Sequence, residues 1–271
     1  MRLSPGLAVA AAAVAAFTLT ACGPASSPSP GATGPASAAP TPSAAAPAET
    51  STPDPEPTAA AREVPPECES IDVELGGTLY GGDLGSCLQA AIAGYDTGML
   101  TLTGPELAGE ATYHYDPQFE FRANLETGDG PVEMSFVDGV MMLDDGSGPV
   151  VGDPESDDPD TRLAGVAGEL YRVFSDPGFI GDLIDASESW NVADATDEVQ
   201  LRSGETVTAY RVESSAPFRW FDIPVDSYAV QFTADWQPVS AASTSDFFGT
   251  SSTITQEFSR LGEPVSIEPL G

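Results

Sequence analysis

The sequence predicts an α+β domain built on a strongly curved antiparallel β-sheet, a half-barrel, with helices covering its concave face. Segments in which apolar and polar residues alternate occur both before and after a central helical region. Short connections containing Asp, Gly and Pro join many of these segments, as in antiparallel hairpins. A sheet of about nine antiparallel strands usually curls or splits. We therefore expect the helices to cover the concave side of a curled sheet.

Residues 1–21 have the organisation of a lipoprotein signal peptide. Arg2 supplies a positive n-region and Leu7–Leu19 an apolar h-region, in the order found in export signals. The apolar run is shorter than the roughly 20 residues of a membrane-spanning helix. The motif Leu19-Thr20-Ala21-Cys22 resembles the lipobox of bacterial lipoproteins. That resemblance implies cleavage before Cys22, acyl chains on this residue, and anchoring at the outer face of the cytoplasmic membrane, in the cell envelope.

Residues 22–66 are expected to form a lipidated, disordered stalk. They are mainly Ala, Pro, Ser, Thr and Gly and include no aromatic residue. Such a composition does not bury enough apolar surface to offset the entropy of ordering the chain. The remaining residues, 67–271, are enough for one globular domain with a sizeable core.

The charge of the chain is strongly negative. Its 9 basic residues, all arginine, stand against 42 acidic residues and give a net charge of -33. This charge argues against binding of nucleic acid or of anionic lipid surfaces, because both need a positive patch. The absence of lysine excludes Schiff-base chemistry. We expect a monomer without a metal or another cofactor.

Cys68 and Cys87 are predicted to form a disulfide, because an exported chain folds in an oxidising compartment. A redox or metal site would require a Cys-x-x-Cys motif or clustered histidines, and the sequence has neither. The glycine-rich residues 73–86 between the two cysteines are expected to be poorly structured. The disulfide would then join an irregular segment to a helix over Leu84–Tyr95, with Asp83 as its cap.

Alternating patterns predict a meander of about five strands in the first half of the domain. The predicted strands lie in residues 99–104, 109–115, 118–126, 132–136 and 140–143. Turns are expected at Asp116-Pro117 and at Asp138-Gly139. The apolar residues expected to share a face within each strand are Ala111, Tyr113 and Tyr115, then Phe119, Phe121, Ala123 and Leu125, then Val132, Met134 and Phe136.

Two helices are predicted in the middle of the chain. In residues 161–174, apolar side chains recur at helical spacing at Leu163, Val166, Leu170, Val173 and Phe174. Asp176-Pro177 then offers a cap and a first-turn proline for a second helix. That helix would bury Phe179, Ile180, Leu183 and Ile184. The acidic run 153–160 before the first helix is read as a solvated loop, with calcium binding through carboxylate oxygens as the alternative.

The last part of the chain returns to strands, in residues 207–214, 227–234, 238–245 and 252–259. Tyr228, Val230 and Phe232 are expected to share one face, as are Ile254 and Phe258. Between these strands, residues 215–226 contain Phe218, Trp220 and Phe221 close together. These three aromatic residues are expected to form either a flexible rim at a cavity mouth or a hydrophobic plug.

A resemblance to a known family lies in the C-terminal motifs. Pro238-Val239 begins a strand, a Thr-rich strand ends at Phe258-Ser259, and Gly262-Glu263-Pro264-Val265 and Ile267-Glu268-Pro269 follow. This arrangement resembles the LppX/LprG-type lipoproteins of actinobacteria, which share a half-barrel with the carriers LolA and LolB. The resemblance implies an acyl-lined cavity between the concave sheet face and the covering helices, which binds or carries lipids, glycolipids or lipoproteins.

Such a cavity would be lined by apolar side chains of the strands and helices. The candidates are Phe119, Phe121, Leu125, Met134, Phe136, Met142, Phe179, Leu183, Tyr228, Val230 and Phe232. Periodicity does not distinguish a cavity wall from a filled core. Two functions therefore stay open, a lipid-binding or lipid-transfer lipoprotein and a non-transporting interaction or sensor protein with a filled core.

Catalysis is not expected. His114 is the single histidine of the chain, it lies within a predicted strand, and the sequence has no Gly-x-Ser-x-Gly nucleophile motif.

Overall fold

The computed structural model describes residues 63–115, 118–176, 178–220, 223–247 and 250–271, all within one compact unit, Thr58–Gly271. The predicted signal peptide, Cys22 and residues 22–62 of the stalk lie outside the described residues. So do the Asp116-Pro117 turn, Pro177 and Phe221. Among the described helices, none has the length and apolar character needed to cross a bilayer.

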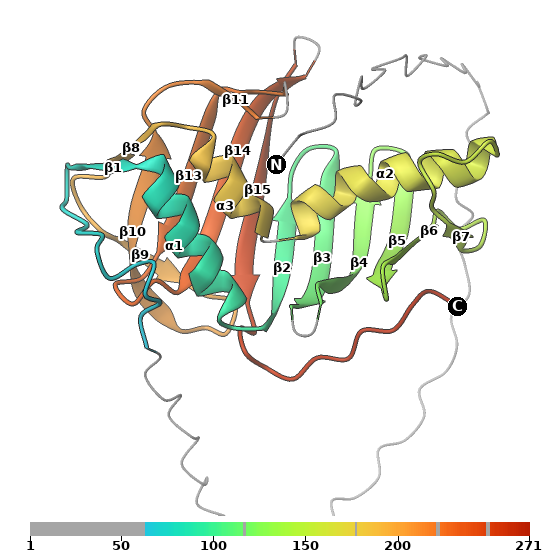
Figure 1. The fold of residues 1–271 in the computed structure, drawn as a ribbon, viewed down its shortest axis with the longest axis horizontal. Helices are drawn as coiled ribbons and strands as arrows, with labels where there is room; N and C mark the ends of the chain where they lie inside the picture. The colour runs from blue at the N-terminus through green and yellow to red at the C-terminus, as the bar shows by residue number, and fades with distance from the viewer. Residues whose placement is uncertain (1–62, 116–117, 177, 221–222, 248–249) are drawn as a thin grey trace, which may run out of the picture. The chain divides into compact units, whose positions relative to one another are not determined.

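The predicted α+β class is confirmed: in the part of the chain that the structure describes, a sheet of 13 antiparallel strands is accompanied by three helices (Figure 1). One run of strands comprises β2 (Thr97–Thr103), β3 (Leu107–His114), β4 (Glu120–Thr127), β5 (Gly130–Val137), β6 (Val140–Asp144) and β7 (Val150–Val151). The other comprises β8 (Ser189–Val192), β9 (Asp197–Gln200), β10 (Thr206–Ser214), β13 (Ser227–Phe232), β14 (Pro238–Phe247) and β15 (Thr250–Ser259).

The two runs of strands join where β15 pairs with β2. The strand order is β1-β8-β10-β13-β14-β15-β2-β3-β4-β5-β6-β7, where β1 is Thr78–Tyr80 and β9 pairs with β10 alone. Within the described residues, the edge strands β1 and β7 do not pair with each other, so the sheet is open, as in a half-barrel. A separate hairpin is formed by β11 (Phe218–Trp220) and β12 (Ile223–Val225).

The pairing register divides the side chains of the sheet between two faces. One face carries buried apolar side chains, including the row Leu100, Ala111, Ala123 and Met134 across β2 to β5. We call this the helix-covered face, because Gly168 of the central helix lies against Met141 on it. The opposite face is largely polar. The predicted alternation in β4 and β13 is confirmed, since Phe121, Leu125, Tyr228, Val230 and Phe232 are all buried.

Met142, which was predicted to line a cavity together with Met134 and Phe136, lies on the opposite face of the sheet from these two residues. It pairs with Ser135 and with Val151, whereas Met134 and Phe136 pair with its neighbours Leu143 and Met141. Because successive residues of a strand point to opposite faces, Met142 lies on the face away from the helices. The prediction that it lines a cavity on the helix-covered face is wrong.

Three helices lie in front of the sheet in Figure 1: α1 (Gly81–Ala93), α2 (Pro159–Ser175) and α3 (Gly178–Asp185). α2 and α3 connect β7 at one edge of the sheet to β8 near the other edge. They must therefore cross the helix-covered face. In the figure, α1 and α3 lie side by side over the strands of the second run, and α2 lies over the first run.

The first helix begins earlier than predicted. Its N-cap is Tyr80, without a side-chain hydrogen bond, so Asp83 lies in the first turn and is not the cap. The glycines that made this segment look unstructured instead allow α1 to approach α3 closely. A Cβ at Gly85 would lie 2.6 Å from the carbonyl oxygen of Gly181 in α3. The supposedly unstructured segment also contains β1.

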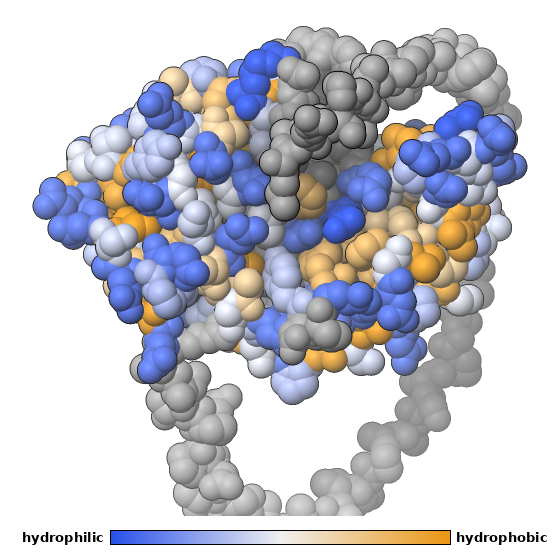
Figure 2. Space-filling view, in the orientation of Figure 1, coloured by the Kyte–Doolittle hydropathy of each residue, from blue (hydrophilic) through white to orange (hydrophobic). Residues whose placement is uncertain are grey.

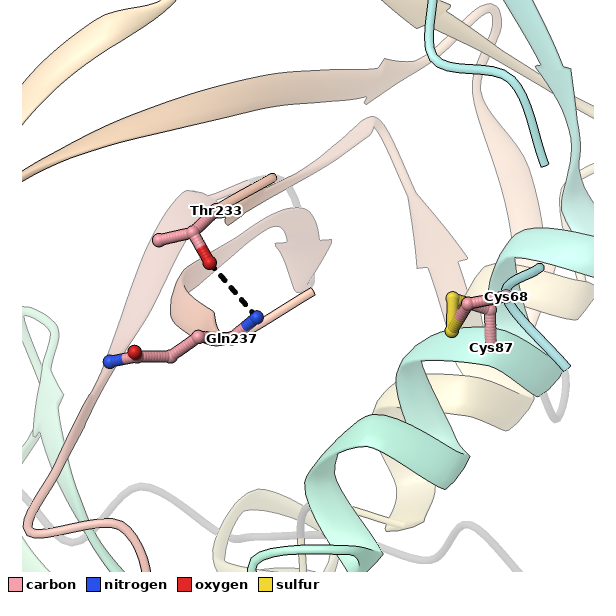
Figure 3. Close-up of a disulfide and its surroundings, with 4 residues drawn as sticks. All are labelled: Cys68, Cys87, Thr233 and Gln237. Atoms are coloured by element: carbon pink, nitrogen blue, oxygen red, sulfur yellow. Dashed lines mark hydrogen bonds between the residues drawn. A yellow bond between two sulfur atoms is a disulfide. The ribbon is translucent and has the colours of Figure 1, made fainter. Parts of the chain in front are cut away.

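The predicted disulfide between Cys68 and Cys87 is present and joins the segment before β1 to α1 (Figure 3). Both cysteines are buried. Figure 3 also shows the β13–β14 turn, in which the Gln237 amide donates to Thr233 Oγ1 at 3.0 Å. Trp236 in this turn stacks on Phe232 with a centroid separation of 4.5 Å.

The central helix α2 begins at a capped position and docks differently from the prediction. Asp158 is the N-cap and accepts a hydrogen bond from the Thr161 amide at 2.9 Å. Leu163 and Val166 were expected on the apolar face of a covering helix, yet they are 69% and 54% exposed. The helix packs instead through small residues, since Ala164, Gly165 and Gly168 are buried.

The segment after β15 crosses the face opposite to the helices. The Leu270 amide donates to Ser135 Oγ at 3.0 Å, and both residues are buried. Ser135 neighbours Met134 in β5, so its side chain lies on the opposite face of the sheet. The C-terminal segment thereby covers part of the sheet face that the helices leave open.

Candidate ligand-binding site

A cavity of about 50 Å³ lies on the helix-covered face beside α3. We call it the α3 pocket. Its walls are α3, the β11–β12 hairpin and the strands β13, β14 and β15; the lining residues are Phe179, Ile180, Leu183, Trp220, Ile223, Val225, Tyr228, Ser243, Ser245, Ser252, Ile254 and Gln256. The volume has room for a few water-sized groups and is below the roughly 300–1,000 Å³ of a typical small-molecule site.

Helix α3 contributes three side chains to this pocket. The amide of Gly178, its first residue, donates to Asp176 Oδ1 at 2.8 Å, so the residue predicted as the cap accepts a hydrogen bond from the first turn of α3. Phe179 and Leu183, at a spacing of four, are half-buried and line the pocket together with the buried Ile180, whereas Ile184 is buried in the core. Phe179 meets Trp220 edge to face, with a centroid separation of 5.9 Å.

The other side of the α3 pocket is polar, which the sequence analysis missed. Ser243 pairs with Tyr228, and Ser245 pairs with Ser252, so these hydroxyl groups share the helix-covered face. Ser245 and Gln256 are buried. The available signal was the composition of residues 240–245, which are only Ser, Ala and Thr although a strand that faces a core would carry larger apolar side chains.

A row of aromatic rings lies beneath α2 on the same face. Tyr115, Phe119, Phe121 and Phe136 follow one another with centroid separations of 5.3, 5.8 and 6.4 Å. We call these four residues the aromatic row. Phe121 is fully buried, but the other three are only half-buried. Figure 2 shows apolar surface gathered beneath α2 over β3 to β6, which is where the row lies.

Arg172 of α2 lies over this row. The centre of its guanidinium group is 4.5 Å from the centroid of the Phe136 ring and 6.0 Å from that of Phe119, within the range of a cation–π interaction. Its Nε is buried and has no hydrogen-bond partner among the described residues. Its ion pair with Glu169 joins Nη1 to Oε1 over 4.0 Å.

A hydrogen-bonded pair stands between the aromatic row and the α3 pocket. The Tyr115 hydroxyl donates to Asp176 Oδ1 at 3.1 Å. Burial raises the pKa of the Asp176 carboxyl, against the opposing effects of the Gly178 amide and the Tyr115 hydroxyl. Burial likewise raises the pKa of Tyr115, and the adjacent Asp176 charge adds to this effect. The pair fixes the junction of α2 and α3 to the end of β3.

Apart from Met142 on the opposite face, the predicted cavity residues lie in three environments on the helix-covered face: the α3 pocket, the aromatic row and the core. Phe179, Leu183, Tyr228 and the rim candidate Trp220 line the α3 pocket, and Phe119 and Phe136 belong to the aromatic row. Phe121, Leu125, Met134, Val230 and Phe232 are at most 3% exposed and lie in the core. Phe218 is half-buried and packs edge to face on Trp190 at 6.4 Å.

His114 lies on the other face of the sheet. Its Nε2 is 2.9 Å from Glu120 Oε2, and the pair is placed by the β3–β4 register. The backbone amide of Asp138 is the main cause that lowers the pKa of Glu120. The described residues contain no cluster of three or more potential metal ligands, the acidic run 153–160 included.

Comparisons with known proteins find similarity to solved structures. Neither a protein-family model nor a curated protein matches the sequence. A solved structure is similar: that of LprF from Mycobacterium bovis. The chains are 14% identical, with a TM-score of 0.46, and the match covers 70% of this chain and 97% of LprF. The likeness concerns the fold, and the function proposed below rests on the residues of this chain.

Proposed function

We propose that this chain is a lipid-anchored protein of the cell envelope that binds a lipid or another acylated ligand on the helix-covered face of its sheet. Cys22 carries the anchor, residues 22–66 are the stalk, and residues 67–271 are the binding domain. The protein acts as a monomer and as a binding protein rather than an enzyme. The proposal extends to a protein that also transfers the bound ligand from one membrane to another.

The observation that supports it best is that large apolar side chains on this face are left half-buried. Phe119 and Phe136 lie beneath α2, and Phe179 and Leu183 line the α3 pocket. Contiguous apolar surface that is not sealed in a core is characteristic of binding sites. The acyl chains would lie over the aromatic row and in the α3 pocket, where helices α2 and α3 contact them.

A second candidate is supported by the size of the cavity. At about 50 Å³, the α3 pocket accommodates only a short part of an acyl chain unless α3 or the β11–β12 hairpin moves. A protein with a filled core would instead present its surface to a macromolecular partner. This is the non-transporting interaction or sensor protein.

Native mass spectrometry with lipid extraction distinguishes the two. The full chain carrying Cys22→Ala, which has no acceptor for the anchor, would be exported from an actinobacterial host and purified without detergent. We expect a lipid that remains bound with one-to-one stoichiometry. A protein mass without added lipid at several expression levels, together with an extract without acyl chains, would overturn the lipid-binding proposal and leave the interaction protein.

A matched pair of variants locates the ligand. Leu183→Glu places a charge in the wall of the α3 pocket, whereas Leu163→Glu makes the same change at a side chain that is 69% exposed on α2. Because an ionised carboxylate is costly to bury against acyl chains, we expect the lipid to be lost from Leu183→Glu and retained by Leu163→Glu. Retention in both variants would place the ligand elsewhere.

A further inference from the structure

We propose that the ligand carries an anionic head group, a phosphate or a carboxylate, and that the guanidinium group of Arg172 binds it. This inference rests on the proposed function, because it assigns a charge to the ligand of the same helix-covered face. It adds a specificity that the apolar walls do not provide.

The first argument is that Arg172 is incompletely paired in a strongly acidic chain. Four other arginines each place a nitrogen within 3.3 Å of a glutamate oxygen: Arg122, Arg202, Arg211 and Arg260. Arg172 approaches Glu169 only at 4.0 Å, and the Glu169 side chain is 57% exposed. A pair of that length at the surface is weak. The charge of Arg172 is therefore available to a ligand.

The neighbouring acid, Asp176, is already engaged by other groups. Its Oδ1 accepts hydrogen bonds from the Tyr115 hydroxyl and from the Gly178 amide. Burial is the largest influence on the pKa of this carboxyl and raises it, which favours the neutral form, although the nearby charge of Arg172 acts in the opposite direction. The Asp176 carboxyl thus holds the junction of α2 and α3 in place. Its two side-chain hydrogen bonds among the described residues are to Tyr115 and Gly178, and neither involves the guanidinium group of Arg172.

The second argument is the geometry of the guanidinium group. It lies 4.5 Å from the centroid of the Phe136 ring, so an aromatic ring occupies one side of the group. An acceptor must then approach the N–H edge, which matches the two oxygens of a carboxylate or phosphate. Nε on that edge is buried without a partner, and buried donors without an acceptor are rare in folded proteins.

The position of Arg172 also matches an amphipathic ligand. Its side chain is 28% exposed, whereas the Phe119 and Phe136 rings beneath it are half-buried on the helix-covered face. A head group at Arg172 would stay at the boundary with solvent. The acyl chains would continue over the aromatic row, toward the core of the sheet.

The test compares two soluble lipids that differ only in the head group, dioctanoylphosphatidic acid and dioctanoylglycerol, with inorganic phosphate as a third probe. Binding to the full chain carrying Cys22→Ala would be measured by tryptophan fluorescence and native mass spectrometry. We expect phosphatidic acid to bind at least about tenfold more tightly than diacylglycerol. Arg172→Gln should weaken the binding of phosphatidic acid by about tenfold or more and change the affinity for diacylglycerol by less than about twofold.

Arg122→Gln is the matched control. Arg122 follows Phe121 in β4 but lies on the opposite face, paired with Glu133 at 2.9 Å. The same loss of one positive charge there should leave both affinities within about twofold. If circular dichroism shows that Arg172→Gln does not fold, Arg172→Lys is tested in its place. It keeps the charge without the planar fork, so a loss confined to phosphatidic acid is again expected.

The possible outcomes separate this inference from the proposed function. Equal affinity for the two lipids, or no effect of the Arg172 variants on the affinity for phosphatidic acid, would overturn the inference of an anionic head group. The proposal that the protein binds a lipid would be unaffected. Binding of inorganic phosphate as tightly as phosphatidic acid, with the same dependence on Arg172, would show a free-anion site and also overturn it. Failure of both lipids to bind would overturn the proposed function together with this inference.

Discussion

Replacing Gly85 by alanine is expected to destabilise the protein, although alanine is the better helix former. Gly85 is a buried residue of α1. A Cβ at this position would lie 2.6 Å from the carbonyl oxygen of Gly181 and 3.3 Å from the amide nitrogen of Asp185. Both atoms belong to the backbone of α3, so no side-chain rotation relieves the contact. α1 and α3 would have to separate.

Two opposing terms determine the magnitude. Alanine is favoured over glycine in a helix by about 1 kcal/mol. Overpacking of a well-packed interior costs about 1–3 kcal/mol, and a contact to rigid backbone belongs to the upper part of that range. The net loss should be about 1–2 kcal/mol. For a domain of roughly 200 residues this lowers Tm by about 2–8 °C.

The assay is thermal unfolding followed by circular dichroism, with Gly82→Ala in the same helix as the control. The Cβ of that variant would meet the ring of Tyr80 at 2.8 Å and the carboxylate of Asp185 at 3.1 Å. Tyr80 is 59% exposed and has space to rotate away. We expect Gly82→Ala to melt at or slightly above the wild-type Tm. A Gly85→Ala variant as stable as the wild type would refute the close backbone packing of α1 on α3.

Three further predictions concern the disulfide, the helix junction and the outer surface of α2. Replacing both Cys68 and Cys87 by serine should cost about 3 kcal/mol in urea unfolding, since a loop of 19 residues is opened; a change below about 1 kcal/mol would contradict the loop-closure argument. Burial raises the pKa of Asp176 above 3.8, so its stabilising contribution is complete below that value and is lost as the pH rises through the raised pKa. The asparagine of Asp176→Asn does not ionise, so the Tm of this variant minus that of the wild type should increase between about pH 4 and pH 7. A difference in Tm that does not change with pH would contradict the raised pKa. Leu163→Gln and Val166→Gln should each change the free energy of unfolding by less than about 0.5 kcal/mol, because both side chains are exposed; a larger loss in urea unfolding would show that they pack against something.

The sequence was informative wherever a short local pattern has a physical cause. Alternation predicted the buried face of β4 and of β13, because side chains of a strand point to opposite sides in turn. Asp176 was predicted as a helix cap, because its carboxylate accepts the free amide of the first turn. The expectation that the chain folds in an oxidising compartment predicted the disulfide between Cys68 and Cys87, which is present.

Other predictions failed because they depended on neighbours. The run Val140–Leu143 is apolar on both faces, so only its pairing with β5 decided that Met142 points away from the helices. Helical spacing marked Leu163 and Val166 as buried, but the close approach of Gly165 and Gly168 to the chain beneath them turned the larger residues outward. The short strands β1, β7, β8 and β9 carry too few residues for a periodic pattern.

The sequence by itself determined the α+β class, most of the longer strands, the two central helices and the disulfide. Only the tertiary structure decided that Tyr115, Asp176 and Arg172 meet at the α2–α3 junction, and that serine side chains form one side of the α3 pocket. The physical reason is that periodicity reports which side of an element is apolar. What lies opposite that side depends on strand register and helix docking, and both are set by contacts between residues far apart in the chain.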